Sequence, residues 1–216
     1  GLLTGMSFVL ILAFSIPLGI FTARHAGGRL DRAMTAVNQA LMAIPAFVTG
    51  ILLTYVFGLV LRWFVPGNYV SPGDNFGASL WYFLFPAVSI ALPRVAMTVK
   101  MLRSSILSEL QKDYVRTSHS RGNSDRATLY RHVLRNAMGP VVSFLAMTVA
   151  DIVAGSVVIE QVFSLPGLGR MLLTSIANRD YPVVQAVVVI VAFWVVLVNL
   201  LADLINQRLD PRLRLT

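Results

Sequence analysis

The sequence predicts an all-α, polytopic membrane protein with five transmembrane helices in this chain. Of its 216 residues, 56% are hydrophobic and 13% are charged, whereas a soluble domain carries about 25% charged residues. The mean hydropathy is +0.71. Apolar runs of about 20 residues, the length that crosses a bilayer, recur along the chain rather than once at its start. Because lipid offers the backbone no hydrogen-bond partner, segments of this length are expected to be helices.

The first two spans lie at residues 2–23 and 35–61, within a single transmembrane domain over residues 1–216. The run RHAGGRLDR ends the first span. The second is followed by RWFVPGNYVSPGDNFG, which is rich in Gly, Pro and Asn and is therefore typical of a loop. The chain has no Cys, so disulfides and thiolate metal sites are excluded.

The other three spans lie at residues 80–100, 138–159 and 183–204. Prolines inside spans are expected to kink them without ending them, because packed neighbours can satisfy the freed carbonyl groups. These prolines are Pro17, Pro45, Pro86 and Pro93. Aromatic residues near the outer boundaries are typical interfacial anchors. They are Tyr55, Trp63, Trp81 and Tyr82.

The distribution of Lys and Arg predicts the orientation, since cytoplasmic loops carry the excess of these residues. When the loops are assigned to alternate sides, 15 of the 18 fall on the side that holds residues 24–32, 94–135 and the tail after Leu204. Residue 1 is therefore expected outside, and the C-terminus inside. A cytoplasmic N-terminus for the full-length protein then requires an odd number of further spans before Gly1; one is the simplest choice, which makes six.

A basic segment, residues 104–137, separates the third span from the fourth. Such a run also sets topology and contacts anionic headgroups, at about 1 kcal/mol per Lys or Arg. Its pattern indicates more than that. Leu129 and Val133 recur at helical spacing, and Gly122 followed by Asn123–Asp125 predicts a helix stop, a turn and an N-cap. We expect two short helices at the inner face, which offer a docking surface for another protein.

Two stretches of this segment, DYVRTSHSRG (113–122) and RHVLRNAMGP (131–140), resemble a known pattern. They are similar to DYVRTAxAKG and RHxLRNxxxP in the permease subunits of binding-protein-dependent ABC importers, in the dipeptide, oligopeptide and nickel branch. VVIEQVFSLPGLGRMLLTSIANRDYPVVQ (157–185) and LDPRLR (209–214) resemble further blocks of that branch. The resemblance covers nearly the whole chain. Ser118, Ser120 and Arg121 depart from it, because Ala, Ala and Lys are usual there.

The resemblance implies that the segment is a cytoplasmic coupling loop, with Arg116, Thr117, Ser118 and Gly122 at the EAA-type motif positions. The chain has no GxxxxGK[ST] loop to cradle phosphates, so it is expected to bind no cofactor, and ATP and Mg²⁺ belong to partner subunits. The residues expected at the ATPase contact are Asp113, Tyr114, Arg116, Thr117, Ser118, Gly122, Arg131, His132, Arg135 and Asn136.

The implied partners are two ATPase subunits, a second permease subunit that is a different sister chain, and a periplasmic solute-binding protein. The implied location is the bacterial inner membrane, where the chain also contacts lipids. The expected function is permease subunit of an ATP-driven importer that carries short peptides, or a related solute such as nickel or glutathione. The sequence does not discriminate between these solutes.

Candidate residues of the translocation path lie in the third and fourth spans and in the turn that follows. Asp151 is midway along the fourth span, where a carboxylate is costly and a functional role is the default. Arg94 is a partner of opposite charge; the alternative is a protonated or Arg-paired Asp151 that only faces the bundle. Glu160, Pro166, Gly167 and Gly169 mark an outer turn, FSLPGLGR, which is expected near an outer gate but also has the composition of a simple helix end.

Two other function classes compete. An ion-gradient-driven secondary transporter or channel would need paired intramembrane charges or inverted repeats, and no clear repeat is present. A scaffold that binds nucleic acid or lipid would need interleaved aromatics for base stacking, and only Tyr114 and Tyr130 qualify, so no nucleic-acid partner is expected. His25, His119 and His132 lack metal-ligand spacing, and no metal site or catalytic set is expected.

Overall fold

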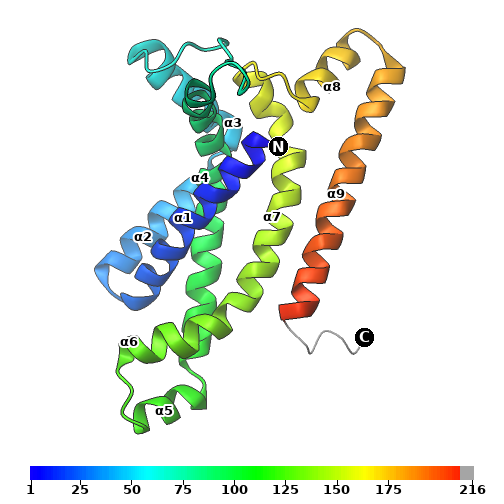
Figure 1. Cartoon of the computed structure of the whole chain (residues 1–216). Coiled ribbons are helices and arrows are strands. Elements are labelled where there is room, and N and C mark those ends of the chain that lie inside the picture. Colours follow the sequence, from blue (N-terminus) through cyan, green and yellow to red (C-terminus); the bar gives the residue numbers. More distant parts are fainter. Residues whose placement is uncertain (210–216) are drawn as a thin grey trace.

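The computed structural model describes the backbone of residues 1–209 and, within it, all side chains except those of residues 154, 202, 203 and 205–209. The regular elements of this part are helices, two of them of the π type (Figure 1). In chain order they are α1 (Leu2–Arg24), α2 (Arg29–Ala43), α3 (Ala46–Leu53), η1 (Thr54–Val60), α4 (Phe76–Leu110), α5 (Asp113–Ser120), α6 (Asp125–Thr128), η2 (Leu129–Val133), α7 (Leu134–Val162), α8 (Leu168–Ala177) and α9 (Tyr181–Leu209).

Helix α4 is the centre of the fold, and α1, α2, α3 and α7 all pack against it, while α9 packs against α7 and α8. The contact with α1 is close because buried positions recur along α1 at intervals of one turn, and three of them are the small residues Ser7, Ser15 and Gly19. Ser7 and Ser15 are fully buried, and a Cβ added at Gly19 would lie 2.8 Å from Leu102 Cδ2. Small residues at such positions let membrane helices approach and gain packing energy.

The long helices cover four of the predicted spans. Helix α1 covers residues 2–23, and α4 extends beyond 80–100 at both ends. Helices α7 and α9 cover 138–159 and 183–204. By length and composition, the described part holds four helices that can cross a membrane, or five if a bent pair counts as one span.

The second predicted span, residues 35–61, is not one continuous helix. It is divided into α2 and the α3–η1 pair, which meet at an angle of 93°. Ile44 and Pro45 are extended at the break, with ψ of 119° and 143°. A residue before proline is pushed out of the helical region by its clash with the proline ring, which explains the stop. Pro17, Pro86 and Pro93 remain inside α1 and α4.

The long helices alternate in direction, so Gly1 and α5 lie at opposite ends of the molecule (Figure 1). The end that carries α5 is called the α5 end below, and the other the Gly1 end. In the predicted cytoplasmic tail after Leu204, the backbone of residues 205–209 continues α9, and residues 210–216, with most of LDPRLR, lie outside the described residues.

The prediction of two short helices in the basic segment is right for α5 and wrong for the second. Helix α6 continues through η2 into α7, so the chain is helical from Asp125 to Val162. Nothing between Thr128 and Leu134 breaks a helix, and the wider π turn of η2 absorbs the change in direction visible in Figure 1.

Candidate functional site

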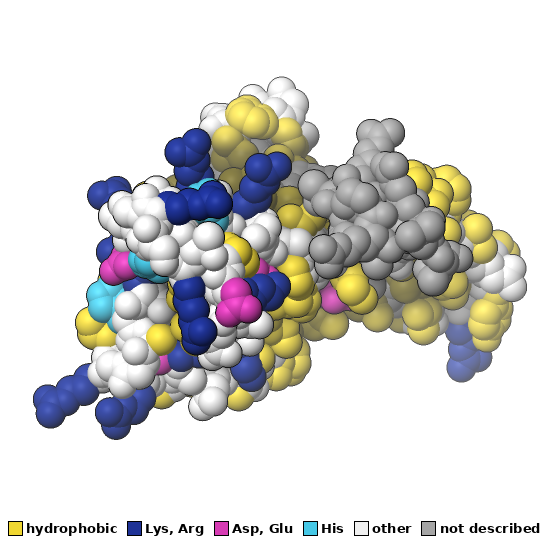
Figure 2. Space-filling view, turned by 90° about the horizontal axis from the view of Figure 1, so that it is seen from below, with side chains coloured by type: hydrophobic (Ala, Val, Ile, Leu, Met, Phe, Trp, Pro, Cys, Tyr) yellow, Lys and Arg dark blue, Asp and Glu magenta, His cyan; other side chains and the backbone are white. Residues whose placement is uncertain are grey.

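The α5 helix presents one fully exposed polar face at the α5 end. Asp113, Arg116, Thr117 and Ser120 lie three or four residues apart, and therefore on one face. The Arg116 side chain is 85% exposed, and its 3.9 Å contact with Asp113 is a surface ion pair. Figure 2, which views this end, shows Lys and Arg side chains gathered over it with a few acidic side chains and histidines between them.

Ser118 lies on the opposite face of α5 and is buried in the loop. Its hydroxyl is hydrogen-bonded to Thr128 Oγ1 at 2.9 Å, and Asn123 Nδ2 donates to it at 3.1 Å. Ser118 is 7% exposed and Thr128 1%. The serine therefore holds α5 against α6, and does not belong to the exposed face that carries Arg116 and Thr117.

The turn after α5 has the form that the sequence predicts. Gly122 adopts φ +82°, and its N–H donates to His119 O at 2.9 Å. A non-glycine residue would pay about 1–2 kcal/mol for this left-handed conformation. Ser124 Oγ then accepts from Ala127 N at 3.3 Å and is the N-cap of α6.

Tyr114 closes the base of the loop, between the end of α4 and the start of α7. Its hydroxyl donates to Glu109 Oε2 at 2.8 Å, and it also contacts the Asn136 side chain. Burial raises the pKa of the Tyr114 hydroxyl above its usual value, and the contact with Asn136 opposes this change. Nearby, Ser105 Oγ donates to Ala137 O at 2.8 Å, which joins the same two helices.

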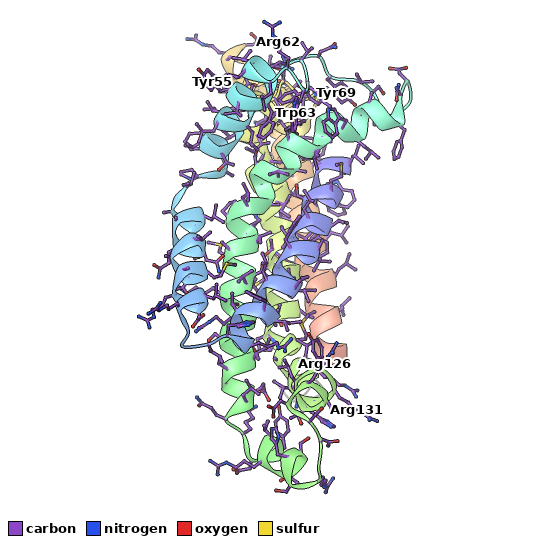
Figure 3. All side chains as sticks on the ribbon, turned by 90° about the vertical axis from the view of Figure 1, so that its left-hand side faces the viewer. Tyr55, Arg62, Trp63, Tyr69, Arg126 and Arg131 are labelled. Atoms are coloured by element: carbon purple, nitrogen blue, oxygen red, sulfur yellow. The ribbon has the colours of Figure 1, made fainter. Side chains whose placement is uncertain are left out.

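Four predicted contact residues lie on η2 and the first turn of α7 rather than on α5. Arg131, Arg135 and Asn136 are exposed, and His132 is half-buried. Figure 3 shows Arg131 beside the loop at the α5 end. The ten predicted residues thus divide between the exposed face of α5, the interior of the loop and the neighbouring helix.

The FSLPGLGR turn at the Gly1 end is organised by Glu160. Its Oε2 accepts from Gly169 N at 2.7 Å and from Arg170 N at 3.2 Å, so the carboxylate caps the first turn of α8. A Cβ at Gly167 would lie 2.2 Å from Glu160 Cδ, and one at Gly169 would lie 2.4 Å from Val157 Cα. Pro166, which precedes Gly167, is exposed.

Tyr82 is a core residue and not the interfacial anchor that the sequence predicts. It is 4% exposed, its hydroxyl donates to Phe163 O at 2.6 Å, and Gly67 N donates to it at 3.1 Å. It therefore ties α4 to the turn after α7. Tyr55 and Trp63 lie at the Gly1 end in Figure 3, and their role as interfacial anchors stays a prediction.

Arg94 reaches α7 at Asp151, but it contacts the backbone. Its Nη2 donates to Asp151 O at 3.3 Å and its Nη1 to Ile90 O at 3.2 Å. Among the described residues, the two side chains form no ion pair within 4.0 Å. The predicted charge partners are thus brought together, with the carboxylate left exposed.

Sequence reasoning missed a bidentate ion pair between Arg103 and Asp31, which joins α4 to the start of α2. The one acidic residue in the basic run RHAGGRLDR is the sequence signal that could have found it, and in the structure Asp31 is 5% exposed. Within the described part of the chain, no group of three or more acidic or His side chains is placed to hold a metal ion.

The model of the binding-protein-dependent transport system inner membrane component family matches residues 15–215. The chain belongs to this family. It is 35% identical over 214 residues to a probable peptide ABC transporter permease protein, y4tP of Sinorhizobium fredii, covering 98% of this chain and 68% of the relative. It is 33% identical to the nickel import system permease protein NikB of Staphylococcus aureus, covering 99% of this chain and 62% of the relative.

A solved structure of the MetNI methionine ABC transporter, in an inward-facing conformation, has the same fold. The TM-score is 0.76 at 16% identity, over 96% of this chain and 91% of that one. The protein is therefore a membrane-spanning permease subunit of an ABC importer. Members of this family work in ABC importers together with ATPase and substrate-binding partners.

Proposed function

We propose that this permease subunit carries a short peptide across the bacterial inner membrane, with the α5 end cytoplasmic and the Gly1 end periplasmic. The peptide-permease relative at 35% identity supports the solute class. Glutathione, itself a peptide derivative, and nickel are the alternatives from the sequence. The orientation is supported by the excess of Lys and Arg at the α5 end.

ATP hydrolysis is assigned to two separate nucleotide-binding subunits that dock on the exposed face of α5. The observation that carries this proposal is the division of α5 into two faces. Val115 and Ser118 are buried inside the loop, whereas the Asp113 and Arg116 side chains are 96% and 85% exposed. The buried face of α5 is already hydrogen-bonded to the rest of the loop. A movement of a subunit bound to its exposed charged face can therefore be passed on to α4 and α7.

The Gly1 end is assigned to the outer gate and to the docking of a periplasmic solute-binding protein. Its support is the Glu160 cap, which links the end of α7 to the start of α8 through Gly169 and Arg170. Movement of α7 would therefore carry α8 with it. A second, different permease subunit completes the path on the other side, and membrane lipids surround both.

A charge reversal on α5 tests the docking face. The full-length chain would be co-expressed with its sister permease and ATPase subunits, and the complex captured through a tag on this chain. Arg116→Glu should reduce the co-purified ATPase and the uptake of a labelled peptide together, by about tenfold, the effect of losing one strong charged contact. Arg126→Glu, on α6, is the matched control and should leave both near wild type.

Retention of wild-type ATPase binding by Arg116→Glu would contradict the assignment of this face. Failure of the wild-type complex to import any peptide, together with ATP-dependent nickel uptake, would contradict the solute class and leave the docking face intact.

A further inference from the structure

Arg94 and Asp151 place two opposite charges halfway along α4 and α7. Arg94 lies near the midpoint of Phe76–Leu110, and Asp151 near that of Leu134–Val162. A charged side chain at the centre of a membrane helix costs about 2.5–3.5 kcal/mol. Such groups are kept where they face a polar cavity or bind something, so their surroundings are informative.

The Arg94 guanidinium is fixed but keeps most of its donors. It has five N–H groups, and the described residues accept from it at Ile90 O and Asp151 O. Gly155 leaves space beside it, because a Cβ there would lie 3.3 Å from Arg94 Nη2. The guanidinium is thus held in place by two backbone carbonyls, and its positive charge also interacts electrostatically with the Asp151 carboxylate.

Asp151 lies on an exposed face of α7. Met147, Asp151, Gly155 and Val158 are exposed and recur at intervals of one turn. No described residue donates a hydrogen bond to the Asp151 carboxylate or forms an ion pair with it. The bond to Arg94 uses the backbone oxygen of this residue. The carboxylate therefore keeps its full acceptor capacity.

Helix α9 has an exposed apolar surface, whereas on the exposed α7 face Asp151 lies among apolar Met147 and Val158. Val189, Phe193 and Val196 are 63–66% exposed and all apolar, as expected of a helix that faces lipid. If the α7 face that carries Asp151 also faced lipid, the protein would bear the free-energy cost of an isolated charge inside the membrane. This face suits a water-accessible path.

A groove between α4, α7 and Met42 of α2 lies on the α5 side of the two charges, and neither Arg94 nor Asp151 is among its lining residues. It has a volume of about 590 Å³, and Lys100, Ser104 and Ser108 of α4 are among its lining residues. Met97, three residues from Arg94, and Phe144, seven residues from Asp151, also line it. These intervals are one and two helical turns, so both charges lie on the faces that form the groove.

We propose that Arg94 and Asp151 form a recognition site within the path, in which Arg94 binds the terminal carboxylate and Asp151 the terminal ammonium group of a dipeptide. The inference rests on the proposed import of peptides. An extended dipeptide is about 7 Å long, so its two termini can reach charged groups on two neighbouring helices. The guanidinium fork also matches a carboxylate, and it repels a bare divalent cation.

Uptake of labelled Ala-Ala into proteoliposomes tests the site, using the complete complex with its binding protein. Arg94→Gln and Asp151→Asn should each lower uptake by about tenfold or more, the loss of one charged hydrogen-bonding partner. Arg94→Lys, which keeps the charge, should recover part of it. Arg32→Gln, an exposed cation at the start of α2, is the matched control and should match wild type.

Two readouts separate recognition from structure. Assembly with the partner subunits and ATP hydrolysis without peptide should stay within about twofold of wild type in all variants. The second readout is the uptake rate of Arg94→Gln divided by that of wild type for the same substrate. This ratio should fall for Ala-Ala and not for its C-terminal amide. Both complexes use the same binding protein, so its own preference between the two substrates cancels.

Wild-type uptake of Ala-Ala by Arg94→Gln would overturn the inference alone. Loss of assembly in Arg94→Gln that Arg94→Lys does not restore would also overturn it, because the residue would then be structural. If the wild-type complex imports no peptide, the proposed function fails first, and the inference fails with it.

Discussion

Arg103 donates two hydrogen bonds to Asp31 across 72 residues of sequence, from Nε to Oδ1 at 2.8 Å and from Nη2 to Oδ2 at 2.6 Å. Gly27 N also donates to Oδ2, at 2.9 Å. The pair fixes the loop between α1 and α2 to the part of α4 that projects beyond the predicted third span. It therefore steadies the helix from which the basic segment extends.

Removal of Arg103 should destabilise the protein strongly. The Asp31 side chain is 7% exposed and that of Arg103 29%, so Arg103→Gln leaves a nearly buried charge without its partner. We expect a loss of about 2–4 kcal/mol, somewhat less than for a fully buried pair. The thermal unfolding midpoint of the purified full-length protein in detergent measures it.

The double variant Asp31→Asn with Arg103→Gln should lose less than the sum of the two single variants, because no charge is then left unpaired. Arg29→Gln, at the exposed start of α2, should change stability by less than about 0.5 kcal/mol. An Arg103→Gln protein that unfolds at the wild-type temperature would show that the pair contributes nothing.

Ser118→Ala should loosen α5. The substitution removes the hydroxyl that is hydrogen-bonded to Thr128. The Thr128 hydroxyl, in a residue that is 1% exposed, then lacks this partner, which should lower the free energy of unfolding by about 1–3 kcal/mol. Amide hydrogen exchange within residues 113–120 should become faster. Ser120→Ala is the matched control, because Ser120 is exposed and bonds only to Arg116 O within α5. Equal exchange in the two variants would count against a role for Ser118 in holding the loop.

Glu160→Ala should uncap α8. Loss of the carboxylate that accepts from Gly169 and Arg170 should cost about 0.5–2 kcal/mol. Glu160→Gln keeps an acceptor and loses the charge, so it should cost about 0.3–1 kcal/mol. The unfolding midpoint ranks the variants, with exposed Gln161→Ala as the control. A smaller effect for Glu160→Ala than for Glu160→Gln would contradict the capping role.

The sequence predicts where helices form better than it predicts where they break. Apolar length identifies α1, α4, α7 and α9, because lipid leaves no other backbone structure for them. The effect of each proline depends on packing that the sequence does not display. Helix α4 continues through Pro86 and Pro93 because neighbours surround it, whereas α2, whose only buried residue is Asp31, stops before Pro45.

The position of the candidate site in the chain could be predicted from the sequence, but which of its side chains are exposed and which are buried could not. Gly122 and the N-cap after it follow from local backbone chemistry, and both are present. That Ser118 points inward depends on Thr128, which lies across the turn. Likewise, Arg94 and Asp151 could be paired by sign alone, but only their three-dimensional arrangement shows that the bond goes to a backbone oxygen.

A comparison of two glycines tests how closely α8 must approach α7. A Cβ at Gly169 would lie 2.4 Å from Val157 Cα, a backbone atom that cannot move aside cheaply. Gly169→Ala should therefore displace α8 and cost about 1–3 kcal/mol, as overpacking does. Gly139→Ala, within α7, meets no described atom within 4 Å and should be neutral or stabilising by up to about 1 kcal/mol, because alanine favours the helix. The difference between their unfolding midpoints isolates the steric contact, since both substitutions add the same methyl group to a helix. If Gly169→Ala is as stable as Gly139→Ala, the glycine of the FSLPGLGR turn is not required for packing.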